Sequence, residues 1–440
     1  MIIRLMKNSA LVVSLISLLT LNIQAQNRTE VQGQIGRGGP TVSLISVAIE
    51  KFRASGTFPT YEDSILAYDM KQVLRDDLQF SLLFNVVEPD SAFVTDFAKG
   101  KMNLDDWIYL GAQMLISGRI EREANGFLFT ADVTDIYRNK SIYSHDYVGE
   151  SANYRYVMHK VAADLLLQLT GEEGCYYSKI AYSSDISGHP EIYICDFDGF
   201  APRQITHENS IAVLPNWTPD GKQIYYTSYK KGNSDLYAFD LALNQSRQVS
   251  ARTGLNSGGV MSPDGKFLVA TLSMGEDAEL YLIDPSGKIQ KRLTFSKMID
   301  TSPAWSPYSN EIAFTSDRTG QPQIYITDVD GLNTRRLTFQ GDYNDQASWS
   351  PRGDFIAYSS RERDGFQIYV IDITGTYPQR LTDIGSNESP SWSPDGFHIV
   401  YTSNITGDPR LMMMDFNGLN KRQLDIPGPC KTPDWSKNIK

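Results

Sequence analysis

The chain has 440 residues, of which 41% are hydrophobic and 21% charged, so it is long enough for two or three domains with cores of their own. Its 52 acidic residues outnumber its 41 basic ones and give a net charge of -11, which argues against nonspecific binding to nucleic acid or anionic lipid. The 24 Tyr, 33 Gly and 20 Pro combine strand-forming aromatic residues with turn formers and favour a protein rich in β-structure.

Residues 1–25 have the features of a secretory signal peptide. Arg4 and Lys7 precede an apolar run over residues 10–21, and Ala25 supplies a small residue before the cleavage site. The run is too short for a membrane span, no Cys follows it for lipid attachment, and no later segment is apolar enough to cross a bilayer. We therefore expect an exported, soluble mature chain without membrane insertion.

Residues 26–172 lack any repeat and are predicted to form a mixed domain of helices and strands. Residues 26–40 contain four Gly and are either a linker or an extended arm that pairs with another protein's sheet. Apolar periodicity predicts helices over residues 64–79, 104–110 and 154–169. Strands are predicted over residues 85–88, 114–120, 127–133 and 141–148.

After about residue 175 the sequence repeats with a period of 43 or 44 residues. A phrase of the form Pro-x-Trp-Ser-Pro-Asp-Gly recurs, and its central residue advances in steps of 44, 44, 44, 43 and 43. Five of the six tryptophans occupy this position and a Met occupies it once: Trp217, Met261, Trp305, Trp349, Trp392 and Trp435. A fixed period of this length is typical of β-propellers.

Two further phrases share this period and complete each repeat. A Tyr is followed three residues later by Asp, as at Tyr193 and Asp196, and an Arg-Leu-Thr phrase closes the unit, as at Arg292. Each repeat is therefore predicted to contain four short strands. Pro-Asp-Gly suits a hairpin turn, because Pro fixes φ, Asp bonds to the backbone and Gly permits positive φ. The Asp-x-Asp-Gly turns lack the further ligands of a calcium loop, so Asx turns are favoured over calcium sites.

The order of these phrases predicts how the repeats close. The Tyr phrase begins at Tyr193 with no Trp phrase before it, and the Trp phrase ends at Trp435 with no Tyr phrase after it. The C-terminal strand can therefore complete the N-terminal unit. We expect residues 173–440 to form an all-β six-bladed β-propeller, and truncation after about Pro429 to open its ring.

The cysteines predict neither a disulfide framework nor a metal centre. Cys175, Cys195 and Cys430 are odd in number, no Cys-x-x-Cys occurs and the five His are scattered. We interpret the three cysteines as small buried side chains and expect no metal and no cofactor.

These features together resemble the TolB family, periplasmic proteins of the Tol-Pal cell-envelope system. The resemblance rests on the leader segment, the small α/β domain, the junction from Leu169-Thr-Gly171 to Ser178-Lys-Ile-Ala-Tyr182 and the Pro-x-Trp repeats, and it spans essentially the whole mature chain. It implies a noncatalytic periplasmic adaptor that binds the lipoprotein Pal at the channel mouth and TolA through the N-terminal arm. It also implies roles in outer-membrane integrity and envelope constriction at division. The Gly-rich arm departs from the alternating pattern that strand addition favours.

The resemblance further implies that Pal contacts lie in turns that lead into the innermost strands, just before the Pro-x-Trp phrase. Polar residues recurring at one repeat position would form a ring at the channel mouth, and three carboxylates there favour a cationic or donor-rich partner. Solvated turn residues without a further role are the alternative. The ring is incomplete, because Ala212-Val213 and Cys430-Lys431 take the corresponding positions of two blades. Its members are Asn256 and Ser257, Asp300 and Thr301, Asn344 and Asp345, and Asn387 and Glu388.

An enzyme is disfavoured. No Gly-x-Ser-x-Gly elbow is present, and the chain ends with the sixth blade. Asp300, Asp345 or Glu388 could in principle form a glycosidase pair, but no accompanying Arg or Tyr pattern indicates a reaction. A secreted carbohydrate- or peptide-binding propeller is the stronger alternative. Aromatic side chains facing the channel would support it, whereas the aromatic residues of the repeat are predicted to lie between blades.

Overall fold

A computed structural model of the chain describes residues 30–31, 42–55, 60–124, 126–274 and 277–439. The predicted signal peptide and most of the predicted arm lie outside these residues. Within the described part of the chain, no helix combines the length and the apolar character needed to cross a membrane. The chain divides into two units, residues 1–162 and 163–440. The two units divide within the helix α5 (Tyr154–Thr170). The boundary proposed from the sequence, after residue 172, lies just after the end of this helix.

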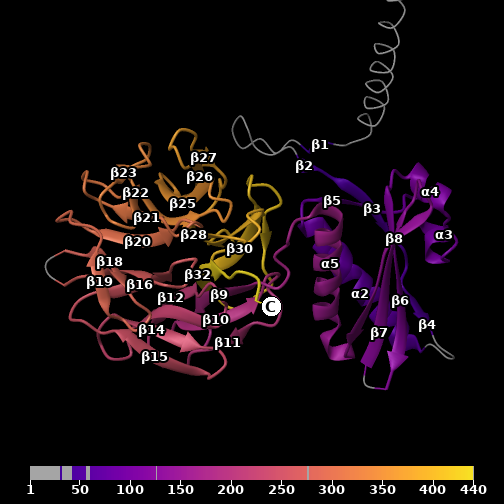
Figure 1. Cartoon of the computed structure of the whole chain (residues 1–440), viewed down its shortest axis with the longest axis horizontal. Coiled ribbons are helices and arrows are strands. Elements are labelled where there is room, and N and C mark those ends of the chain that lie inside the picture. Colours follow the sequence, from indigo (N-terminus) through magenta and orange to yellow (C-terminus); the bar gives the residue numbers. More distant parts are fainter. Residues whose placement is uncertain (1–29, 32–41, 56–59, 125, 275–276, 440) are drawn as a thin grey trace, which may run out of the picture. The chain divides into compact units, whose positions relative to one another are not determined.

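The first unit is built on a mixed sheet with the strand order β5-β3-β6-β7-β8, in which β4 also pairs with β6 (Figure 1). β3 runs parallel to β5 and β6, and β6, β7 and β8 form an antiparallel meander. The strands are β3 (Ile45–Ile49), β4 (Arg53–Ser55), β5 (Phe84–Val87), β6 (Met114–Glu123), β7 (Gly126–Asp135) and β8 (Lys140–Gly149). Near its start, β1 (Glu30–Val31) pairs with β2 (Val42–Ser43).

Helices accompany this sheet: α2 (Tyr61–Phe80), α3 (Val94–Ala98), α4 (Leu104–Tyr109), the short 3-10 helix η1 (Ser151–Asn153) and α5 (Tyr154–Thr170). α2 begins with a capping box between Thr60 and Asp63, whose carboxylate also accepts from Arg122 on β6 at 2.6 Å. The predicted α2, α4, α5 and β5 to β8 are confirmed. The sequence missed β3, because its residues 47–49 are all buried and therefore show no alternation.

The second unit is a propeller of six four-stranded antiparallel sheets among the described residues, as predicted. Blade 1 contains β32 (Cys430–Trp435), β9 (Lys179–Ser184), β10 (Glu191–Asp196) and β11 (Arg203–Gln204). Blade 2 contains β12 (Ala212–Trp217), β13 (Gln223–Ser228), β14 (Asp235–Asp240) and β15 (Gln245–Ser250). Blade 3 contains β16 (Asn256–Met261), β17 (Leu268–Leu272), β18 (Glu279–Ile283) and β19 (Ile289–Arg292).

The remaining blades follow the same order from the innermost strand outward. Blade 4 contains β20 (Asp300–Trp305), β21 (Glu311–Ser316), β22 (Gln323–Asp328) and β23 (Thr334–Arg336). Blade 5 contains β24 (Asn344–Trp349), β25 (Phe355–Glu362), β26 (Gly365–Asp372) and β27 (Gln379–Arg380). Blade 6 contains β28 (Asn387–Trp392), β29 (His398–Ser403), β30 (Arg410–Asp415) and β31 (Arg422–Gln423).

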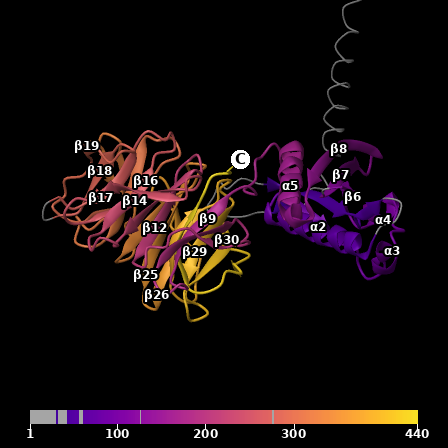
Figure 2. The ribbon, with the colours of Figure 1, turned by 90° about the horizontal axis from the view of Figure 1, so that it is seen from below.

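Blade 1 closes the ring with strands from both ends of the domain. β32 pairs antiparallel with β9, so Trp435 lies opposite Ile180, about 255 residues earlier in the chain. Figures 1 and 2 show the yellow C-terminal strands beside the magenta β9. The predicted closure by the C-terminal strand is confirmed.

The propeller core lies between neighbouring blades. Each cluster of buried apolar side chains combines two blades; Trp217 of blade 2, for example, packs with Ile192 and Ile194 of blade 1. The five repeat tryptophans are 6–8% exposed. Met261 packs into the equivalent cluster between blades 2 and 3. The prediction that the aromatic residues of the repeat fill the space between sheets is confirmed.

Candidate functional site: the propeller channel

The inner strands of all six blades line a channel with a volume of about 520 Å³. Its wall consists largely of Pro, Ser, Thr and small apolar residues from the Pro-x-Trp phrase, and the repeat tryptophans also contribute to it. Because every inner strand runs in the same direction, the first residues of these strands all lie at one mouth of the channel. The Pro-Asp-Gly turns lie at the other.

Each inner strand carries a bulge at the same position, three residues before the Trp. The pairing with the second strand shifts there, and the bulge residue has positive φ, between 50° and 62°. Only one of the six is Gly, although this conformation is costly for residues with a Cβ. The six residues, all in the channel wall, are Leu214, Gly258, Ser302, Gln346, Ser389 and Thr432.

Hydroxyl groups on the second strands support several of these bulges. Thr227 Oγ1 accepts from the amide of Gly258 in the next blade at 3.4 Å, and Thr402 Oγ1 accepts from the amide of Thr432 at 3.1 Å. Such bonds help to hold a bulge that would otherwise be strained. The same position has a hydroxyl in every blade: Ser183, Thr227, Thr271, Thr315, Ser359 and Thr402.

The first member of each predicted site pair is buried within its blade, at most 2% exposed: Asn256, Asp300, Asn344 and Asn387. These residues begin strands and do not lie in turns, which corrects the sequence interpretation. Their side chains reach back into the preceding loop and bond to it, as Asn256 does with Arg252 O at 2.6 Å, or form a buried ion pair, as Asp300 does with Arg318 at 2.9 Å. Asn and Asp are as suitable for bonding to a neighbouring loop from the start of a strand as they are for a position in a turn. Residue type alone therefore did not distinguish a strand residue from a turn residue here.

The second member of each pair is partly exposed near the mouth. Ser257 and Thr301 line the channel. Asp345 accepts from Thr315 Oγ1 at 2.7 Å, which turns its carboxylate toward the blade, and Glu388 accepts from Ser386 Oγ at 3.1 Å. The ring of three carboxylates expected from the sequence is therefore reduced to two, because Asp300 is buried against Arg318.

Asp345 and Glu388 both influence the pKa of Tyr343. Burial, chiefly, together with the negative charges of these two carboxylates, raises the pKa of the Tyr343 phenol, and Arg361 opposes the shift. The structure thus brings two of the predicted residues together at one side of the mouth. It adds Tyr343 and Arg361, whose guanidinium lies 5.0 Å from the Tyr343 ring.

One acidic side chain lies in the channel wall itself. Asp434 on β32 accepts from the amide of Trp217 at 2.7 Å. Burial raises the pKa of Asp434 to about 7, although the bonds from Trp217 and Ser391 act in the opposite direction. Sequence analysis did not single out this residue. A signal was present, because Asp434 occupies the variable position of the Pro-x-Trp phrase, where no other blade has a charged residue.

Loops at the mouth end of the blades expose large apolar side chains. They lie in the loops that precede inner strands and in the loops between second and third strands. Exposed apolar groups around a polar opening are typical of a surface that binds another molecule. This apolar rim comprises Ile186, Ile211, Tyr229, Met274, Ile299, Ile384 and Ile405, which are 39–69% exposed.

The fold and the channel define a six-bladed propeller protein with an N-terminal α/β domain. The TolB beta propeller domain matches residues 167–439, and the TolB amino-terminal domain matches residues 38–142. The chain belongs to the TolB family.

Relatives agree with this assignment. The Tol-Pal system protein TolB of Desulfosudis oleivorans is 36% identical over 224 residues, 49% of each chain. A protein TolB homolog of Chlorobium luteolum is 36% identical over 158 residues, 36% of each chain. The chain thus spans about half the length, or less, of these relatives. The crystal structure of TolB from Acinetobacter baumannii is similar over 93% of this chain and 98% of that one, with a TM-score of 0.77 and 26% identity.

Proposed function

We propose that this protein is a noncatalytic periplasmic adaptor of the Tol-Pal system whose propeller binds Pal at the channel mouth. Membership of the TolB family and the Tol-Pal names of its relatives support the system. The predicted signal peptide supports the periplasm. In this role the protein would contribute to outer-membrane integrity and to envelope constriction at division.

The binding proposal rests on the composition of the channel mouth. An apolar rim surrounds an opening whose wall presents Ser257 and Thr301 and a ring of bulged backbone. Apolar contact area around a few oriented polar groups is the usual composition of a protein-binding surface. Asp345 and Glu388 give this mouth acidic groups suited to a partner that presents cations or hydrogen-bond donors.

The same geometry argues against glycosidase chemistry. Asp300 is fully buried and paired with Arg318, and Asp345 is bonded to Thr315, so two of the three candidate carboxylates have structural roles. A hydrolytic pair would need both groups directed at a substrate. TolA binding remains part of the proposal through the N-terminal arm, which lies mostly outside the described residues.

The first test is a calorimetric titration of the mature chain, residues 26–440, with the soluble domain of Pal from the same organism. We expect saturable one-to-one binding. No binding between the two folded proteins would overturn the proposal and favour a carbohydrate- or peptide-binding propeller.

Matched charge reversals then locate the interface. Glu388→Lys, at the mouth, should weaken binding by about tenfold, because it replaces an attractive charge by a repulsive one. Glu311→Lys, at the start of β21 and therefore at the opposite end of a blade, should leave the affinity unchanged. Equal affinities of both variants and the wild type would remove the mouth from the interface. Asp300→Lys is unsuitable, because it would bury a cation beside Arg318 and unfold the blade.

A further inference from the structure

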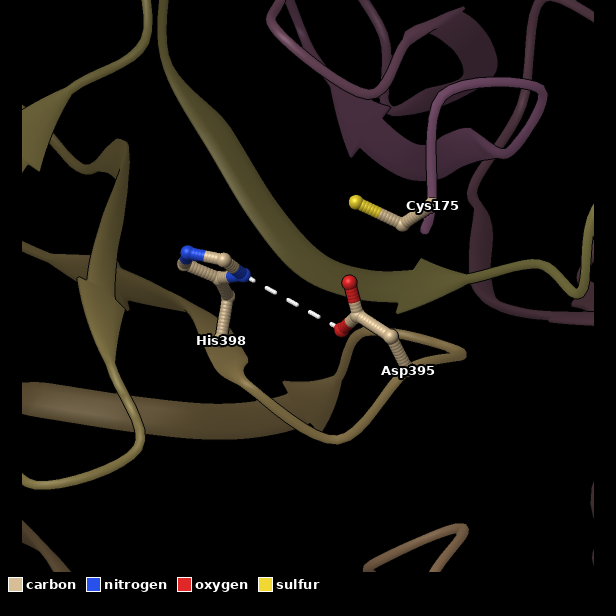
Figure 3. Close-up of side chains that lie close together, drawn as sticks. All are labelled: Cys175, Asp395 and His398. Carbon is tan, nitrogen blue, oxygen red and sulfur yellow. Dashed lines mark ion pairs between the residues drawn. The ribbon is translucent and has the colours of Figure 1, made fainter. Parts of the chain in front are cut away.

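Three side chains with metal-binding groups meet where the chain enters the propeller (Figure 3). Cys175 belongs to the segment before β9, Asp395 to the turn between β28 and β29, and His398 is the first residue of β29. Their Sγ, carboxylate oxygen and imidazole nitrogen atoms all lie within 4.8 Å of one another. Cys175 and His398 are each 1% exposed. Segments 220 residues apart in the sequence thus direct a thiol, a carboxylate and an imidazole at one point.

Local structure holds each of the three groups in place. Asp395 Oδ1 accepts from Ser393 Oγ at 2.5 Å and from the amide of Phe397 at 3.0 Å, which orients the carboxylate. His398 Nδ1 lies 4.0 Å from the same oxygen. Beside Cys175, the Gly174 carbonyl accepts from the Asn438 side chain at 2.7 Å, so the entering segment is bonded to the end of the domain.

The propeller repeat does not account for this combination. Asp264 forms the equivalent turn in blade 3, accepting from Ser262 Oγ at 2.6 Å, without a His nearby in the repeat. The turn therefore explains Asp395, whereas His398 and Cys175 are additions confined to this site. At the position of His398 the other blades that continue into a second strand have Gln223, Phe267, Glu311 and Phe355.

A carboxylate also lies on the far side of the imidazole. Asp415, at the end of β30, is paired with His398 across the strands, and its Oδ1 lies 3.8 Å from His398 Nε2. The two ring nitrogens thus face different groups, Nδ1 toward Asp395 and Nε2 toward Asp415. A metal-binding His is usually oriented in this way, by a carboxylate at the nitrogen that does not bind the metal.

We propose that Cys175, Asp395 and His398 bind a Zn²⁺ ion, with Asp415 as the residue that orients the imidazole. Thiolate, imidazole and carboxylate together are a donor set that Zn²⁺ accepts, and a water molecule would complete the tetrahedron. Zn–ligand bonds of about 2.0–2.3 Å require the three groups to close slightly from their present spacing. Binding deprotonates the thiol and releases its proton to solvent, so no oxidant or co-reactant is needed.

The ion would fasten the segment that enters the propeller to blade 6. Blade 6 lies beside the blade that closes the ring, and β9, which follows Cys175, is the strand that receives β32. A bond between these segments stabilises the closed ring in the way that a structural metal stabilises a fold, since the unfolded chain does not hold the ligands together.

The test uses the mature chain, purified under reducing conditions and stripped of metal, with Co²⁺ as a spectroscopic probe and Zn²⁺ as competitor. We expect one Co²⁺ per chain, a thiolate-to-cobalt charge-transfer band and visible bands of tetrahedral intensity, all lost on addition of one equivalent of Zn²⁺. Zn²⁺ should also raise the melting temperature. Absence of the charge-transfer band, or no binding, would overturn the proposal.

Variants separate the site from its surroundings. Cys175→Ser should abolish the charge-transfer band. His398→Gln should abolish the Zn²⁺-dependent rise in melting temperature. Gln is the natural residue at the equivalent Gln223, where its amide donates to Asp240 at 3.0 Å, so His398→Gln should fold. Asp415→Asn should weaken Zn²⁺ binding about tenfold.

Two matched controls complete the test. Cys195→Ala removes another buried thiol, and Asp264→Asn removes the equivalent turn carboxylate of blade 3. Both should bind Co²⁺ like the wild type. If His398→Gln binds Zn²⁺ as tightly as the wild type, or if Cys195→Ala loses the band, the assignment of the ligands is wrong.

Discussion

The blade that closes the propeller and the five continuous blades follow one repeat but are held together differently. In blades 2 to 6 a turn joins the inner strand to the second strand, whereas in blade 1 the inner strand β32 reaches β9 without a covalent link. One side-chain bond is particular to that junction: Trp435 Nε1 donates to Ser178 Oγ at 2.8 Å. The bond from the Lys179 amide to Ser436 Oγ at 2.8 Å repeats in the other blades, as between the His398 amide and Ser393 Oγ at 2.9 Å. The repeat therefore specifies both the shape of a blade and the strand that closes the ring, and Ser178, which lies outside the repeat, adds one bond to the closure.

The largest expected effect comes from breaking the closing blade. Truncation after Pro429 removes β32, including the buried Trp435, and exposes both the edge of β9 and the cluster beneath it. We expect a loss of more than about 5 kcal/mol, enough to unfold a typical domain, because losing a buried Trp alone costs about 3–5 kcal/mol. Denaturant unfolding followed by circular dichroism measures it.

The matched control for this truncation ends the chain after Ser436. It keeps β32 and the Ser436 hydroxyl and should retain most of the stability. If both truncations unfold equally, the segment after β32 and not the strand itself closes the ring.

A second comparison concerns how tightly each blade's outer turn abuts its neighbour. Gly287 in blade 3 and Gly199 in blade 1 both have φ of +91°. A Cβ on Gly287 would lie 1.8 Å from the carbonyl oxygen of Val249, whereas a Cβ on Gly199 would lie 3.2 Å from Leu424 Cβ. The continuous blade is therefore packed more closely against its neighbour at this turn than the closing blade.

Alanine substitutions should make this difference in packing measurable as a difference in the free energy of unfolding. Both Gly→Ala changes carry the cost of a left-handed conformation, about 1–2 kcal/mol. Gly287→Ala adds a backbone clash and should cost about 1–3 kcal/mol more than Gly199→Ala. Thermal or denaturant unfolding of the two variants side by side checks this, and equal losses would show that the two turns are equally accommodating.

Asp434 on the closing strand predicts a pH dependence of the free energy of unfolding. Burial raises the pKa of Asp434 from 3.8 to about 7. Between these pH values the native state keeps a proton that the unfolded state has released, so this group's contribution to stability declines as pH rises from about 4 to 7. Above pH 7 Asp434 is ionised in both states, so its contribution to stability no longer changes with pH.

Asp434→Asn should remove that dependence. An amide oxygen can still accept from Trp217, and no proton is lost, so the variant should gain on the wild type by about 1 kcal/mol or more between pH 4 and 7. Denaturant unfolding at intervals across this range measures the difference. Parallel stability curves for the two proteins would contradict the prediction.

The smallest expected effect concerns an exposed ion pair in the closing blade. Lys179 Nζ lies 2.5 Å from Asp196, but both side chains are about one-third exposed. Lys179→Met should therefore change the stability by less than about 1 kcal/mol. Lys291→Met, which breaks a more exposed pair with Asp330 between two continuous blades, is the control. A much larger loss for Lys179→Met would mean that the pair between β9 and β10 contributes more than an exposed ion pair does.

The two members of each predicted site pair differ in a property that the sequence did not predict, the direction of the side chain. Asn256 and Ser257 are adjacent, polar and recur with the repeat, so the sequence treats them alike. Strand pleating then directs neighbouring side chains to opposite sides, and Asn256 enters the blade while Ser257 faces the channel. Leu214 and the other bulge residues were missed for a related reason, since a positive φ at a residue other than Gly leaves little trace in residue type.

The sequence by itself determined the propeller, its six blades and the closure of the ring, because the 44-residue period, the turn chemistry and the offset between the Trp and Tyr phrases are local patterns. It also determined most helices and strands of the first unit through apolar periodicity. Only the tertiary structure decided that Asp300 is buried against Arg318, that Asp434 lies in the channel wall, and that Cys175 meets His398. These outcomes depend on contacts between residues far apart in the chain, and no local pattern specifies which distant side chains a closed ring brings together.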